Sequence, residues 1–433
     1  MNDRQTLLGK RPIFYGWYIV AVGFLCHIAS TFPLSSTLSI FLKPVAAELG
    51  VSRGVFSLLR TGEALISAFI APALGRLVDR HGARWLVAIG ALVAGSGFLL
   101  LSQVQNFWQF VLIRWIPVGL GSIFFGYMIV NVAISNWFIC KRGRAVAIAN
   151  TGTGLAKIII PLLAGWLFVV VGWRHAWSVF GILTIALVVA PALILMQRQP
   201  EDMGLHPDGS PVPYDAGTAS QSDAQLSESQ HQALRTDVFW TRAEALHTRT
   251  FWLLVVSFGI ASFGIMGLNL HIFPYVTDLG YPTMVGAVVM SVIAFTQLGS
   301  MLLVGFLAER VDIRKTTTVM FLVQALGLTL AIIATQLVAV YAGFFIYGIG
   351  LGGTFVLREL LWAHYFGRFS LGTVRGMGLL IGQFFASTGA PFFGFLFDVT
   401  DSYRISFTLF ICALLVSAFL VSRLHAPQKS GAA

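Results

Sequence analysis

The stretch Gly75-Arg-Leu-Val-Asp79-Arg80-His-Gly82-Ala-Arg84 lies between two apolar runs, and a related stretch lies 230 residues later. The second copy reads Gly305-Phe-Leu-Ala-Glu309-Arg310-Val-Asp312-Ile-Arg314. The same offset relates three further pairs of residues: Gly152 and Gly382, Pro161 and Pro391, and Arg174 and Arg404. A constant offset over such different residues indicates duplication of a half-protein. Two similar halves in parallel orientation are typical of transporters that rock one half against the other.

The composition indicates a membrane protein. Hydrophobic residues make up 57% of the chain and charged residues 11%, with a mean hydropathy of +0.81, whereas soluble domains carry about 25% charged residues. The pI of 9.8 and the net charge of +10 would suit a nucleic-acid-binding protein, but the basic residues occur in short clusters between apolar runs. Because the positive-inside rule describes that placement, we expect a lipid bilayer around the chain and no nucleic-acid partner.

The predicted fold class is an all-α membrane protein with twelve transmembrane helices in two pseudo-symmetric six-helix halves. The boundaries of the expected spans are accurate to about four residues. The spans are 14–42, 53–75, 84–103, 107–138, 144–170, 175–197, 250–275, 283–308, 315–335, 338–366, 371–398 and 404–422.

The placement of positive charge predicts the orientation. With a cytoplasmic N-terminus, twenty of the 28 Lys and Arg residues lie in cytoplasmic segments. The four that lie outside are Lys43, Arg53, Arg174 and Arg404. We therefore expect a multi-pass protein of a bacterial inner (cytoplasmic) membrane with both termini in the cytoplasm.

The expected domains are an N-terminal half over 1–197, a cytoplasmic linker over 198–248 and a C-terminal half over 249–433. Within the linker, the polar stretch 207–232 is expected to be disordered or loosely ordered. The stretch 237–248 is expected to form a short interfacial helix.

The sequence contains no signature of an enzyme, a cofactor or a metal site. Cys26, Cys140 and Cys412 lie in or at the end of spans, which predicts packing roles rather than disulfides. No Walker loop occurs, and no Cys/His cluster has metal-ligand spacing. We therefore expect no cofactor, no metal and no ATP-driven step.

The loop at 75–84 matches the pattern G-x-x-x-D-R-x-G-x-R at every fixed position. With this loop, and with Arg114 placed before two glycines in span four, the chain resembles the major facilitator superfamily. The second copy departs from the pattern at Glu309 and Asp312. In that family such loops govern the transition between inward- and outward-facing states. The resemblance implies this conformational-switch role for Gly75, Asp79, Arg80, Gly82, Arg84, Gly305, Glu309, Arg310 and Arg314.

Other stretches resemble monocarboxylate porters and bacterial oxalate–formate exchangers. They are Tyr15-Gly-Trp-Tyr18, the run 137–145, Gly172-Trp-Arg174, the linker phrase 200–209, His271-Ile-Phe-Pro274 and Tyr365-Phe-Gly-Arg368. The resemblance implies alternating-access transport of a small organic anion, a carboxylate. The lysine that such porters carry after Phe-Pro in span one is Leu34 here, and the Asp and Arg of their span eight are Gln297 and Met301. The site is therefore expected at other charges.

Lys157 is the first candidate for binding the substrate. An ionised residue at mid-bilayer costs about 2.5–3.5 kcal/mol, so it needs a reason to be there. Lys157 lies near the middle of span five on a polar stripe with Asn150 and Thr153, where it can attract a carboxylate. The alternatives are a structural pair with Glu63 or a side chain that reaches toward the membrane surface.

Arg358 in span ten is the second candidate, because its planar guanidinium suits bidentate carboxylate binding. The alternative is a structural pair with Glu359. Asn269 and His271 in span seven are further substrate-binding candidates, His271 because of the family resemblance.

Arg60 and Glu63 are three residues apart on one helical face, which predicts an ion pair. The alternative makes Glu63 a proton carrier that responds to Arg60 or to substrate, and transport would then be proton-coupled symport. His27 and His271 are alternative proton sites, since histidine titrates near neutral pH. A lone histidine in a helix bundle is more commonly a packing residue.

The predicted function is secondary active transport of a small organic anion by a monomer, with protons as a coupling partner. One alternative is an exporter of amphipathic or cationic compounds, in which Glu63 and Glu359 bind the substrate. A second alternative is a transporter-like receptor that contacts a cytoplasmic partner through the linker.

Overall fold

The computed structural model describes residues 14–139, 141–209, 240–307, 311–366 and 371–427. Within these ranges the chain forms helices joined by turns and contains no strand. The N-terminal elements are α1 (Gly16–Ala29), α2 (Ser35–Glu48), α3 (Arg53–His81), α4 (Ala83–Leu101), α5 (Phe107–Ile113), η1 (Arg114–Leu120), α6 (Gly121–Phe124), α7 (Tyr127–Trp137), α8 (Arg142–Thr184), η2 (Ile185–Val189), α9 (Ala190–Leu195), η3 (Pro200–Met203) and η4 (Pro207–Gly209). The C-terminal elements are α12 (Arg242–Leu246), α13 (Arg249–Asp278), α14 (Thr283–Leu307), α15 (Ile313–Ile333), α16 (Leu337–Phe366), α17 (Leu371–Thr400) and α18 (Tyr403–Ser422).

Each of the twelve stretches predicted as spans is mainly helical over its described residues. The first consists of α1 and α2, separated by a break at residues 30–34. Spans five and six are both in α8 and its continuation, which is interrupted at Gly172. In the described ranges, nine helical segments are long and apolar enough to cross a membrane, and α1 is a shorter apolar helix.

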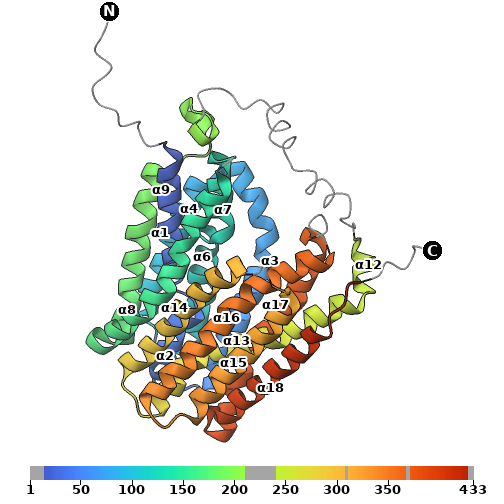
Figure 1. Cartoon of the computed structure of the whole chain (residues 1–433). Coiled ribbons are helices and arrows are strands. Elements are labelled where there is room, and N and C mark those ends of the chain that lie inside the picture. The colour runs from blue at the N-terminus through green and yellow to red at the C-terminus, as the bar shows by residue number, and fades with distance from the viewer. Residues whose placement is uncertain (1–13, 140, 210–239, 308–310, 367–370, 428–433) are drawn as a thin grey trace, which may run out of the picture.

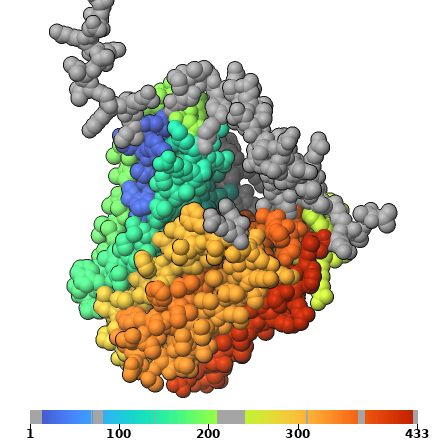
Figure 2. All heavy atoms as spheres, in the orientation of Figure 1, coloured from blue at the N-terminus to red at the C-terminus, as the bar shows by residue number. Residues whose placement is uncertain are grey.

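The helices form two lobes that lie side by side (Figures 1 and 2). In the N-terminal lobe, α8 packs against α1 and α4, and in the C-terminal lobe, α16 packs against α14 and α15. The lobes meet where α3 packs on α17, α8 on α14, and α2 on α13. Large apolar side chains such as Phe306, Val338 and Val399 remain exposed on the outer surface. Such a surface suits lipid rather than water.

The helix bundle has two ends. The linker end is the end at which α1 begins and α9, α16 and α18 finish. The opposite end is the end at which α2 and α13 finish and α18 begins (Figure 1).

The start of the linker is fastened to the N-terminal lobe. The Asp208 carboxylate accepts the backbone N–H groups of Ile139 and Lys141 at 3.0 and 3.1 Å. The Trp137 indole donates to the Gln197 carbonyl at 3.2 Å, and the Tyr15 hydroxyl donates to the Leu195 carbonyl. Three of the stretches that suggested the carboxylate-porter branch therefore meet at one place.

The short helix expected within 237–248 is α12, with a capping box between Thr241 and Glu244. Of the stretch 207–232, residues 207–209 form η4 and the others lie outside the described residues.

Candidate functional site

A central cavity of about 790 Å³ lies between the two lobes. Its N-terminal wall comes from the α1–α2 break, from α3 and from the span that contains η1, α6 and α7, while its C-terminal wall comes from α17. The polar residues that line it are Ser30, Arg60, Glu63, Ser67, Ser122, Tyr127 and Gln383. A pocket of this kind, largely apolar with a few convergent polar groups, is the usual form of a small-molecule site.

Glu63 is held by two arginines. Arg60 Nη1 bonds to Glu63 Oε2, which agrees with the pair predicted from their spacing. Arg114 lies on the other side, with Nε 2.9 Å and Nη2 2.6 Å from Glu63 Oε1. Arg114 is fully buried, and its Nη2 also donates to the Pro33 carbonyl at 2.8 Å. The sequence did not reveal Arg114 as the second partner of Glu63.

The arginine is positioned by an irregular turn. Arg114 begins the π-helix η1, which contains Pro117 and interrupts the α-helical ladder of this span. Single π-helical turns inside α-helices occur frequently at functional sites. The Nη1 atom of Arg114 is buried and has no hydrogen-bond partner among the described residues. Two guanidinium groups share one carboxylate here, so the cluster carries one excess positive charge.

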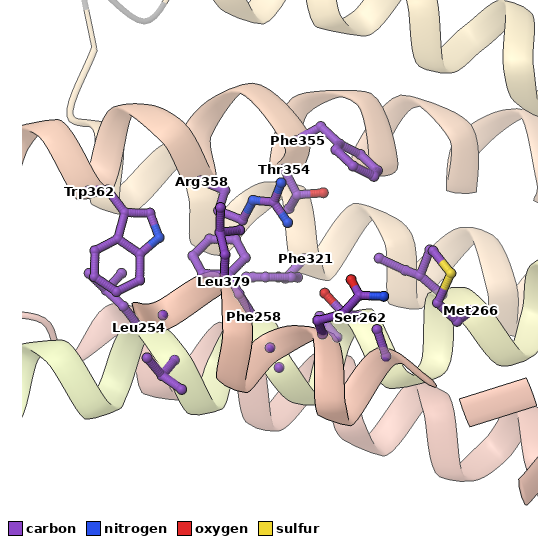
Figure 3. Close-up of a pocket in the computed structure, with 18 residues that line it drawn as sticks. Leu254, Phe258, Ser262, Met266, Phe321, Thr354, Phe355, Arg358, Trp362 and Leu379 are labelled. Atoms are coloured by element: carbon purple, nitrogen blue, oxygen red, sulfur yellow. The ribbon is translucent and has the colours of Figure 1, made fainter. Parts of the chain in front are cut away.

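A second cavity of about 140 Å³ lies in the C-terminal lobe and adjoins the first, because Leu379 and Gln383 line both. Arg358 extends into it from α16, and Trp362 and Phe355 from the same helix lie to either side (Figure 3). Helices α13, α15 and α17 supply the remaining wall, which is mainly apolar.

Arg358 is also part of a cluster of two arginines and one glutamate. Its Nε and Nη2 lie 3.3 and 3.2 Å from Glu359 Oε1. On the other side, Arg375 Nε lies 2.5 Å from Glu359 Oε2 as an ion pair. Among the described residues, Arg358 Nη1 has no hydrogen-bond partner. The predicted pair with Glu359 is present, but it leaves Arg358 exposed to the cavity and the cluster with one excess positive charge.

The structure does not bring Lys157 together with Arg358. Lys157 is half-buried in α8 and is absent from the linings of both cavities. It lies on the part of α8 that packs on α14, where the Ser291 hydroxyl donates to the Ile158 carbonyl. Within the described part of the chain it makes no hydrogen bond or ion pair, and the carboxylate of Glu63 is occupied by arginines instead. Its polar neighbour Asn150 bonds to the Tyr127 hydroxyl at 3.1 Å.

His271 lies at the interface of the two lobes rather than on a cavity wall. It is fully buried; its Nδ1 lies 3.0 Å from the Tyr403 hydroxyl and its Nε2 lies 2.9 Å from the Ala390 carbonyl. Its Nε2 also lies 3.1 Å from the hydroxyl of Ser57 in the other lobe. Asn269 is half-buried nearby in α13.

His27 is buried in α1, and neither ring nitrogen has a hydrogen-bond partner within the described residues. Its ring packs on that of Tyr127, with centroids 5.4 Å apart. Because Tyr127 lines the central cavity, His27 is one side chain away from it.

The lobes are joined at the opposite end by a cluster that we call the closing contact: Lys43, Arg53, Gly54, Asp278 and Asp398. The Asp278 carboxylate lies 2.6 Å from both Lys43 Nζ and Arg53 Nη1. The Asp398 carboxylate accepts the backbone N–H groups of Arg53 and Gly54 at 3.0 and 2.9 Å. An acid of one lobe thus caps the first turn of α3 in the other, where the helix dipole favours negative charge.

A further ion pair at the opposite end lies within the N-terminal lobe. Arg174 donates to the Glu48 carboxylate at 2.8 and 3.1 Å and to the carbonyls of Ser102 and Val104. The hydrogen bonds from Arg174 hold the pKa of the Glu48 carboxyl below its ordinary value.

The two copies of the repeated loop begin their following helices differently. Gly82 precedes α4 with a φ of 74°, a conformation that favours glycine. Asp312 precedes α15 with a φ of −64° and caps it by accepting the Lys315 N–H at 3.0 Å. This hydrogen bond holds the pKa of Asp312 below its ordinary value. The departure of the second copy at this position therefore replaces a glycine turn with a side-chain cap.

The other predicted switch residues are described in part. Arg314 donates to the Leu424 carbonyl at 2.9 Å, which ties the loop to the end of α18. The Arg84 guanidinium lies beside the Trp85 ring, and Gly305 is near the end of α14. Gly75, Asp79 and Arg80 lie in α3. The side chains of Asp79 and Arg80, and all of Glu309 and Arg310, lie outside the described part of the chain.

Comparison with known proteins decides the family. The model of the Major Facilitator Superfamily matches residues 20–387. The chain belongs to that superfamily. Human monocarboxylate transporter 14 is 24% identical to it, over 96% of this chain and 91% of the relative. The oxalate:formate antiporter of Oxalobacter formigenes is 25% identical, over 76% of this chain and 72% of the relative. These relatives confirm the resemblance to the carboxylate-porter branch.

Solved structures of the superfamily share the fold. A bacterial homologue of the human lysosomal transporter Spinster, described as inward-facing and unoccupied, superposes with a TM-score of 0.73 at 15% identity, covering 96% of this chain and 98% of that one. A D-xylose–proton symporter gives 0.70 at 15% identity, covering 96% and 99%. Together with the helices described above, these matches confirm the predicted major-facilitator fold.

Proposed function

We propose that this protein is a secondary transporter for a small organic anion, a carboxylate, that moves by alternating access. The observation that carries the proposal is the charge of the two arginine clusters. Arg60 and Arg114 share Glu63, and Arg358 and Arg375 share Glu359. Each cluster retains one positive charge beside a cavity, where a carboxylate would neutralise it. The relatives named for monocarboxylate and for oxalate and formate support the same class of substrate.

The arrangement of the lobes supports a particular state of the cycle. The closing contact joins them at the opposite end, and the central cavity lies between this contact and the linker end. With the orientation predicted from positive charge, the linker end faces the cytoplasm of a bacterial cell. Both termini then lie in the cytoplasm as well. The structure would then be the inward-facing state of a monomer.

Proton coupling would follow from competition at Arg60. A substrate carboxylate that reaches Arg60 competes with Glu63 for the same guanidinium. Release of Glu63 from Arg60 would free one of its oxygens to accept a proton. His27, one side chain from the cavity, is the alternative proton site.

The test is uptake of radiolabelled carboxylates by the full-length protein in proteoliposomes, with and without a pH gradient. Arg358→Gln and Arg60→Gln should each reduce uptake by about tenfold or more, because a charge-assisted hydrogen bond is worth about 1.5–3 kcal/mol. Lys157→Gln tests the site predicted from span five. Uptake of organic cations alone, or carboxylate uptake that survives both arginine substitutions, would contradict the proposal.

The aromatic wall beside Arg358 is the observation that favours the alternative, an exporter of amphipathic compounds. A cationic substrate would need a free acid, and the carboxylates of Glu63 and Glu359 are each paired with two arginines. Glu63→Gln separates the two functions, since it should abolish cation export but leave anion binding in place.

A further inference from the structure

The cavity beside Arg358 is built from apolar groups with one available charge. Rings of Phe258, Phe321 and Trp362 and the side chain of Met266 form its walls (Figure 3). The Thr354 hydroxyl is already used, because it donates to the Gly350 carbonyl and accepts the Gln324 amide. The other polar side chains of the lining, Ser262 and Gln383, are uncharged. Arg358 is therefore the cation of this lining that can hold a carboxylate.

The volume of this cavity sets the size of what it can enclose. It measures about 140 Å³, and an engineered apolar cavity of about 150 Å³ in another protein binds benzene. A single six-membered ring or a branched alkyl group of similar size would fill it. A two-carbon acid would leave most of its apolar wall uncovered.

The charge of the Arg358 cluster sets the charge of the ligand. With Glu359 shared between Arg358 and Arg375, one positive charge remains. One carboxylate balances that charge. A second carboxylate on the same ligand would lie against the apolar wall, where an unpaired charge is costly.

We infer that the substrate is a monocarboxylate with an apolar body the size of one ring, which enters this cavity while its carboxylate binds Arg358. The inference rests on the proposed function and narrows its substrate class. It places the smaller dianion oxalate outside the preferred substrates.

The first experiment uses phenylacetate as the probe. Binding of radiolabelled phenylacetate to the purified full-length protein is competed with unlabelled acetate, oxalate and 4-biphenylacetate. We expect phenylacetate to bind about tenfold or more tightly than acetate, because the ring buries apolar surface. Oxalate should compete weakly, and 4-biphenylacetate should also be weaker because its second ring exceeds the cavity.

The second experiment fills the cavity. Gly382 lines this cavity, and a Cβ atom on Gly382 would meet no atom within 4 Å. The leucine side chain of Gly382→Leu would therefore occupy the cavity. This variant should reduce phenylacetate affinity about tenfold or more and acetate affinity by less, so that the ratio of the two affinities falls. Gly299→Leu is the matched control, because Gly299 also has open space around it and is exposed on α14. Arg358→Gln should weaken both acids.

The outcomes separate this inference from the proposed function. If no carboxylate of any size binds, the proposed function fails. If acetate or oxalate binds as tightly as phenylacetate, or Gly382→Leu preserves the ratio, the ring subsite is overturned and anion transport stands. If Gly382→Leu does not fold, the relative affinities of the unmodified protein for phenylacetate, acetate and 4-biphenylacetate decide whether the ring subsite exists.

Discussion

Arg114 is the residue on which the N-terminal cluster depends. It is fully buried against Glu63 and the Pro33 carbonyl. Glu63 keeps Arg60 as a partner when Arg114 is removed, so the loss is that of the charge-assisted hydrogen bonds of Arg114, each worth about 1.5–3 kcal/mol. Arg114→Gln should therefore lower the free energy of unfolding by about that amount. Denaturation of the purified protein in detergent measures the change. The double substitution Arg114→Gln with Glu63→Gln should cost less than the sum of the two single losses, since the Arg114–Glu63 pair can be broken only once; strictly additive losses would contradict this coupling.

The residues of the site show which contacts a sequence can predict. The Arg60–Glu63 pair follows from helical periodicity, because residues three apart lie on one face. Arg114 and Arg375 join the two glutamates from other helices, and the rotation of one helix relative to another is not written in its own periodicity. Lys157 shows the same limit: its depth in the span was predictable, but the neighbour it faces was not.

Among the elements, α3 and α17 make the closest approach between the lobes. A Cβ atom on Gly394 would lie 2.7 Å from the Gly54 Cα and from the Arg53 carbonyl oxygen, which are backbone atoms that cannot move aside. Gly394→Ala should therefore separate the helices at the opposite end and shift the population away from the structure described. The measurement is the rate at which a membrane-impermeant maleimide, added only at the linker end of the protein in membrane vesicles, labels Ser67→Cys, in the central cavity, in a variant without the natural cysteines. We expect slower labelling.

Gly299→Ala, at an exposed glycine of α14, is the control for this substitution and should leave the labelling rate unchanged. Equal rates in Gly394→Ala and the unmodified protein would mean that the α3–α17 approach does not hold the opposite end closed.

The helices themselves were largely predictable, because the length of an apolar run fixes the length of a span. Their interruptions were not. The break at residues 30–34 and the π-helix at Arg114 both border the central cavity. Each contains a proline, Pro33 or Pro117, which removes a backbone donor, but hydropathy does not reveal the form that the interruption takes. Asp278 and Asp398 are not identifiable from the sequence for a related reason: their partners lie in the other lobe.

At the scale of the whole molecule, we expect the closing contact to couple substrate affinity to conformation. Asp278 binds Lys43 and Arg53 across the lobes, so Asp278→Asn removes two ion pairs from the state described without touching either cavity. The apparent dissociation constant equals the intrinsic constant divided by the fraction of molecules in the binding-competent state. If each pair contributes about 0.5–1 kcal/mol, that fraction falls by up to about tenfold wherever the two states are closely balanced, and phenylacetate binding measured at the linker end weakens in proportion. A short bifunctional thiol reagent that cross-links Lys43→Cys to Asp278→Cys would restore the affinity, because it spans the reach of the lysine side chain and holds the closed end together without any charge. Weak binding that persists in the cross-linked protein would place the effect of Asp278 at the site itself, and the link between the opposite end and the cavities would be lost.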